Sequence, residues 1–121
     1  MTIEQIEKNS SYLFYCKDNY INGIRPADIG SKKKDSYIKL VEIAKLYFNN
    51  NLAEKFSGYL MEDHYFVSLW TAHLILEYGQ PDENLKKLCL NEINKYSDNP
   101  LAPDVAIQEK KWLANYLETN K

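Results

Sequence analysis

Hydrophobic positions recur along the chain at the three- to four-residue spacing of α-helices, without the strict alternation of a half-buried strand. Clusters of Asn, Gly, Pro and Asp separate these periodic segments and mark turns. The pattern predicts an all-α domain of about six helices, over residues 2–21, 35–48, 51–61, 65–78, 82–96 and 103–118.

Individual segments differ in how much of their surface is apolar. The first predicted helix has a capping box at Thr2 and Gln5, and we expect the side that carries Ile3, Ile6, Ser10, Leu13, Phe14 and Ile21 to face the core. Asn51 and Glu54 have the same capping spacing at the start of the third helix. The segment 65–78 is apolar nearly all round, which predicts the most buried helix. The segment 82–96 is expected to turn Leu85, Leu88, Cys89, Ile93 and Tyr96 inward.

A weak internal repeat relates the third and fourth helices to the last two. Asn51-Leu52 and Asn84-Leu85 are offset by 33 residues, and Val67 and Val105 by 38. Repeated helix pairs that bury their faces on one another form an α-solenoid. We therefore expect one domain over residues 1–121, in which an N-terminal helix and loop (1–34) precede antiparallel helix pairs (35–121) stacked as a short solenoid.

The stretch DHYFVSLWTAHLILEYGQPDENLKKLCLNEI, residues 63–93, resembles a HEAT-type repeat, with an acidic corner, a small residue at Ala72 and a turn with Pro81 before an amphipathic helix. Trp70 and Thr71 stand where such repeats commonly have a small residue. Short bacterial proteins similar to this pattern include HEAT-like immunity proteins of contact-dependent growth inhibition and polymorphic toxin systems. The resemblance implies protein binding.

The charge balance favours a protein partner over nucleic acid. Fifteen basic and seventeen acidic residues give a net charge of −2, and Arg25 is the single arginine, so guanidinium groups that bind phosphate are nearly absent. Between Lys55 and Lys86 there are five acidic residues and no lysine or arginine. This segment is typical of a solvated acidic surface or of a surface that faces a basic partner.

Four residues of the fourth helix, Phe66, Trp70, His73 and Glu77, fall within one narrow arc of the helix. The polar members predict that this stripe is exposed, as an interaction surface with aromatic anchors. Alternatively, the N-terminal helix covers Phe66 and Trp70, while His73 and Glu77 form an i,i+4 pair at the edge.

In the last helix, Glu109 lies at the centre of a face made by Val105, Trp112 and Tyr116. A buried, unpaired carboxylate would cost several kcal/mol, so either a cation pairs with Glu109 or this face is a surface. If both stripes lie on the same side of the protein, they form an acidic aromatic patch made of Trp70, Glu77, Glu109, Trp112 and Tyr116. We expect Glu62 and Asp63, at the acidic turn before the fourth helix, to bind the partner as well.

Catalytic and metal-binding motifs are missing from the sequence. His64 and His73 have no metal-ligand spacing, there is no phosphate-binding Gly-rich loop, and neither Cys16 nor Cys89 has a neighbouring motif that activates a thiol. Asp63-His64 is compatible with a general-base pair or with an acidic first turn. We expect a protein that is not an enzyme and needs no cofactor or metal.

The leading hypothesis is a cytoplasmic immunity protein that neutralises a basic, nuclease-type toxin domain by occluding its active site, and that is a monomer or weak homodimer without this partner. A HEAT-like scaffold that associates with itself is the alternative. The sequence has no long apolar segment and no N-terminal signal pattern, so we expect neither membrane insertion nor secretion.

Overall fold

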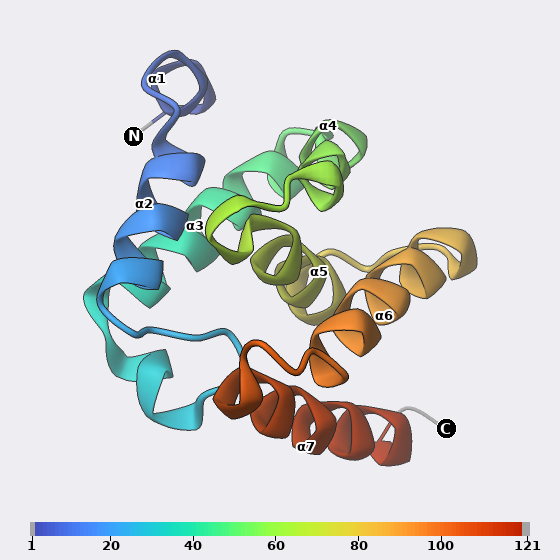
Figure 1. Ribbon diagram of the computed structural model, residues 1–121. Helices are drawn as coiled ribbons and strands as arrows, with labels where there is room; N and C mark the ends of the chain where they lie inside the picture. The colour runs from blue at the N-terminus through green and yellow to red at the C-terminus, as the bar shows by residue number, and fades with distance from the viewer. Residues whose placement is uncertain (1, 120–121) are drawn as a thin grey trace.

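The computed structural model describes residues 2–119, and within that range the protein has seven α-helices, three short 3-10 helices and no strand; 79% of these residues are helical. The all-α prediction is confirmed. The elements (Figure 1) are α1 (Ile3–Lys8), α2 (Ser11–Ile21), η1 (Ile29–Lys33), α3 (Asp35–Asn49), α4 (Ala53–Ser57), η2 (Gly58–Met61), η3 (His64–Phe66), α5 (Val67–Tyr78), α6 (Glu83–Ser97) and α7 (Pro103–Thr119).

Helix α5 is the central element, as its composition predicts. Residues 67–75 are all buried, and α2, α3, α4 and α6 all pack against this helix (Figure 1). The hydroxyls of Tyr12 in α2 and Thr71 in α5 are hydrogen-bonded at 2.8 Å, and Thr71 donates to the Val67 carbonyl oxygen. Helix α7 packs on α6. The residues of α5 therefore belong to one core shared by both halves of the chain.

The first predicted helix is broken in two. The capping box at Thr2 and Gln5 is confirmed, but α1 ends at Lys8, and Ser10 adopts a left-handed conformation with φ 51° before α2 begins. The break rotates α2 relative to the expected face, so Tyr12, Cys16 and Asn19 are buried. Phe14 and Ile21, expected inside, are exposed. Because of this local conformation, residues 2–119 contain seven α-helices rather than the six predicted.

Two further predictions are wrong, one about the residue that caps a helix and one about which side chains of α6 face the core. Asn51 does not cap the third helix, because it takes a left-handed conformation with φ 59° and Leu52 is the N-cap residue without a side-chain bond. That helix is short, with α4 followed at once by η2. In α6, Leu88 is exposed rather than inward, while Cys89 and Ile93 are buried as predicted.

The helices of residues 2–119 contain no segment with the length and apolar character that a membrane crossing requires. Figure 1 shows instead short and medium helices that cross one another around α5.

Candidate functional site

The predicted stripe on α5 is an internal surface. Trp70 and His73 are buried, and Phe66 and Glu77 are partly buried, so the expectation of an exposed stripe is wrong. The alternative holds for Phe66, whose ring lies 5.2 Å from that of Tyr20 in α2. It does not hold for Trp70, which packs on Tyr37 of α3 at 5.1 Å.

Glu109 is buried together with a partner from another helix. Its Oε1 lies 2.6 Å from His73 Nε2, and the two side chains are 0% and 1% exposed. The two atoms share one hydrogen bond, whose donor depends on the tautomer of His73. His73 thus pairs with Glu109 of α7 rather than with Glu77 of its own helix.

A second contact joins the same two helices. Trp112 Nε1 donates to Glu77 Oε1 at 3.3 Å, and the Trp112 ring lies 4.3 Å from the His73 ring and stacks on Tyr116. His73, Glu77, Glu109 and Trp112 are called the polar seam below. Four residues of the predicted patch, Glu77, Glu109, Trp112 and Tyr116, come together around His73, whereas Trp70 packs on Tyr37 instead. The seam holds α5 and α7 to each other and is not an open surface.

Polar groups of this region are incompletely paired. Trp70 Nε1, His73 Nδ1 and Glu109 Oε2 are buried without a hydrogen-bond partner among the described residues. Burial raises the pKa of the neighbouring Tyr37, and the negative charges of Glu77 and Glu109 raise it further. The hydroxyl of Tyr37 donates to the Pro26 carbonyl oxygen at 3.3 Å. The seam is therefore a low-dielectric site in which charge is expensive.

The other predicted residues lie at an exposed turn, residues 61–66, called the corner below. The Glu62 carboxylate accepts from the backbone N–H of His64 at 3.2 Å and lies 2.6 Å from His64 Nδ1. These hydrogen bonds lower the pKa of Glu62 and raise the pKa of His64. Both side chains contact solvent, with 38% of Glu62 and 82% of His64 exposed. Asp63, beside them, is also exposed.

The corner has a strained backbone. Tyr65 and Phe66 are consecutive left-handed residues with φ 53° and φ 59°, a conformation that bulky residues rarely adopt. Ser68 N–H donates to the Glu62 carbonyl oxygen at 2.9 Å and closes the turn. The ring of Tyr20 contacts both aromatic rings, at 5.5 and 5.2 Å. Strain of this kind tends to occur at binding and catalytic sites.

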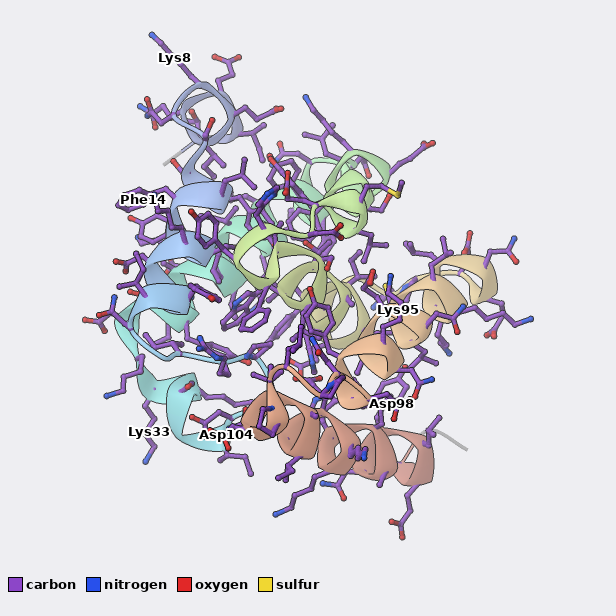
Figure 2. All side chains as sticks on the ribbon, viewed as in Figure 1. Lys8, Phe14, Lys33, Lys95, Asp98 and Asp104 are labelled. Atoms are coloured by element: carbon purple, nitrogen blue, oxygen red, sulfur yellow. The ribbon has the colours of Figure 1, made fainter. Side chains whose placement is uncertain are left out.

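Two shallow depressions adjoin the corner. One, of about 360 Å³, lies against α2 and is mostly apolar; its lining includes Leu13, Phe14, His64 and Tyr65. The other, of about 260 Å³, lies between η2 and α6, where Met61 and Leu88 form part of its wall. Phe14 and Met61 are 61% and 87% exposed, and Figure 2 shows Phe14 on the outer side of α2. The helical pattern placed Phe14 inside, and nothing in the sequence singles out Met61.

Neither cysteine has the environment of a reactive thiol. Cys16 and Cys89 are buried and unpaired, and burial raises the pKa of both thiols, that of Cys89 to about 12. Within residues 2–119 no group of three or more His, Cys, Asp or Glu side chains is placed to hold a metal ion.

Comparisons of this chain with protein-family models, with curated proteins and with solved structures find no match.

Proposed function

We propose that this protein binds another protein through the corner and its two depressions, and that it acts as an immunity protein that occludes the active site of a basic toxin domain. The observation that carries the proposal is a strained turn with a depression on each side, each lined by a large exposed apolar side chain. Met61, Phe14 and Tyr65 are exposed around that turn. Large apolar side chains exposed around a depression are typical of an interaction site.

Charge around the corner supports a basic partner. Glu62 lines the depression against α2 and Asp63 is exposed next to it, while the nearby Lys95 is paired with Glu92 at 2.9 Å. Lysine or arginine side chains that surround the substrate groove of a nuclease would complement these carboxylates.

The buried members of the predicted site have a different role in this proposal. Trp70, His73 and Glu109 are too deeply buried to touch a partner. His73 and Glu109 hold α5 and α7 together, whereas Trp70 packs α5 on Tyr37 of α3. Glu62 and Asp63 are accessible for direct contacts with a partner. Phe66 anchors the corner to the core, because its ring packs on the rings of Tyr20 and Tyr96.

The HEAT-like arrangement is part of the same proposal. The helix pairs would be α4–η2 with α5 and α6 with α7, and the packing of α6 on both α5 and α7 supports such stacking. The short α4 is a departure from a regular repeat. We propose a cytoplasmic location, where an immunity protein meets a toxin that has entered the cell.

The test is protection of growing cells. The protein is produced together with the toxin domain encoded beside it, and growth is compared for the wild type, Met61→Asp and Ile29→Asp. Ile29 is the matched control, because it is 77% exposed and lies in η1 outside the corner. We expect Met61→Asp to lose protection and Ile29→Asp to keep it.

Equal protection by both variants would remove the corner from the interface. A second contrary outcome is that the wild-type protein gives no protection and forms no complex with the toxin domain. If its mass in sedimentation then rises with protein concentration, the self-associating scaffold replaces the immunity function.

A further inference from the structure

A third hollow, separate from the two depressions, is lined by Phe66 and by residues of α7. It has a volume of about 500 Å³ and is bounded by the loop after α2 and by the beginning of α7, which lie beside each other in Figure 1. Apolar groups of Phe66, Leu101, Ala102 and Val105 share its lining with Arg25 and Gln108. Cavities of this size accommodate small organic molecules.

Arg25, the single arginine of the sequence, is held rigidly at this cavity. Its Nη1 donates to the carbonyl oxygens of Asn19, Tyr20 and Ile24 at 3.2 to 3.4 Å. Its guanidinium also lies over the rings of Tyr20 and Phe66, at 5.4 and 5.0 Å. The strained conformation of Phe66 thus places an aromatic face against the guanidinium.

The charge of Arg25 has no counter-ion in the part of the chain that the structure describes. No carboxylate there comes within 4 Å of it, and its Nε and Nη2 make no hydrogen bond to these residues, which leaves one edge of the guanidinium unused. Burial lowers the pKa of Arg25, which reports the cost of removing its charge from water. A guanidinium edge with two N–H groups matches two oxygens of one carboxylate or phosphate.

We infer that this cavity binds a small organic molecule that carries a carboxylate or phosphate group, with Arg25 as the anion-recognising residue and the apolar wall as the site of its hydrocarbon body. The cavity lies outside the two depressions of the proposed toxin contact and shares only Phe66 with the corner.

Asp104 also lines the cavity, and Figure 2 shows it at the beginning of α7. Its negative charge opposes an entering anion. Asp104 therefore weakens the binding of an anion to Arg25. Removal of its charge should strengthen that binding, whereas loss of Arg25 should weaken it.

The experiment is an NMR titration of the full chain, labelled with ¹⁵N, at constant ionic strength. Benzoate and phenyl phosphate are the probes, and uncharged benzamide is the control ligand. We expect saturable shifts at Arg25 Nε–H and at the Val105 amide with one or both anions but not with benzamide. The stronger anion identifies the carboxylate or the phosphate class.

Three variants sharpen the result. Arg25→Lys keeps the charge but loses the two-point contact, and should weaken binding by about tenfold. Asp104→Asn should strengthen binding severalfold. Lys17→Gln is the matched control, because Lys17 lies over Tyr65 outside this cavity and its loss should leave the affinity unchanged.

Shifts that benzamide reproduces, or anion binding equal in the wild type and Arg25→Lys, would overturn the inference. If Arg25→Lys does not fold, Asp104→Asn decides, since unchanged affinity in that variant would also overturn it.

Discussion

Two histidine–glutamate pairs in this protein have the same nitrogen–oxygen distance of 2.6 Å and opposite surroundings. His64 and Glu62 are two residues apart at the exposed corner. His73 and Glu109 are thirty-six residues apart in the polar seam and almost completely buried. Water solvates and screens the first pair, so its contribution to folding is small. The second pair is removed from water, so each partner depends on the other.

The comparison shows that distance alone does not decide the energetic role of an ion pair. In the seam, the orphaned His73 Nδ1 and Glu109 Oε2 mean that even the intact pair is incompletely compensated. At the corner, water can form the hydrogen bonds that His64 and Glu62 do not make with each other. We therefore expect substitutions in the seam to act on stability and substitutions at the corner to act on binding.

The largest effect is expected for Glu109→Ala. Removal of the carboxylate leaves a buried histidine and a cavity, which should lower the free energy of unfolding by about 3 to 5 kcal/mol. Urea denaturation followed by circular dichroism measures this loss. Glu118→Ala is the control, because Glu118 lies on the same helix but is exposed. A loss below about 1 kcal/mol would contradict the dependence described for the seam.

A smaller effect is expected when both partners are replaced. The double substitution His73→Leu with Glu109→Leu removes both members of the pair together with their unpaired atoms, so the variant should recover most of the loss and lie within about 2 kcal/mol of the wild type. The double-mutant cycle with the two single leucine variants gives the coupling between the residues. Additive losses would show that His73 and Glu109 do not act as a pair.

Trp112→Phe probes the half-buried edge of the seam. The substitution removes the hydrogen bond to Glu77 but keeps an aromatic ring against His73, and we expect a loss of about 1 kcal/mol in the free energy of unfolding. Chemical denaturation of this variant and of Trp112→Ala separates the hydrogen bond from the ring packing, because the alanine variant should lose clearly more. Equal losses would assign the whole effect to the hydrogen bond.

The smallest effect on stability is expected for Glu62→Gln, which should leave the unfolding midpoint unchanged but lower the pKa of His64 towards its ordinary value of 6.5. The raised pKa of His64 stabilises the fold below pH 6.5 and ceases to do so as the pH rises through the raised value. The lowered pKa of Glu62 acts above its ordinary value of 4.5 and ceases as the pH falls through the lowered value. The contribution of the pair to stability is thus complete between pH 4.5 and pH 6.5.

An NMR titration of the His64 ring measures this shift. Asp63→Asn is the control, because Asp63 raises the pKa of His64 less than Glu62 does. A larger change in the pKa of His64 with Asp63→Asn than with Glu62→Gln would show that Asp63, and not Glu62, is the main cause of the raised pKa.

Local pattern predicted the helical class and the central burial of α5, because those depend on near neighbours in the chain. The break at Ser10 was missed, since this serine takes a left-handed conformation with neither glycine nor proline to mark it and makes no cap bond. The partner of Glu109 was also out of reach, because His73 is supplied by another helix. A helical wheel shows which residues share a face of α5, but α3 and α7 decide whether that face meets water.

The two buried thiols give a way to follow how separate parts of this molecule open. Cys16 lies in α2 and Cys89 in α6, on different sides of α5, and each thiol has a raised pKa. An alkylating reagent can modify either sulfur only after the surrounding helix has moved away. Comparison of the two labelling rates would show whether α2 and α6 open as one cooperative unit or as two.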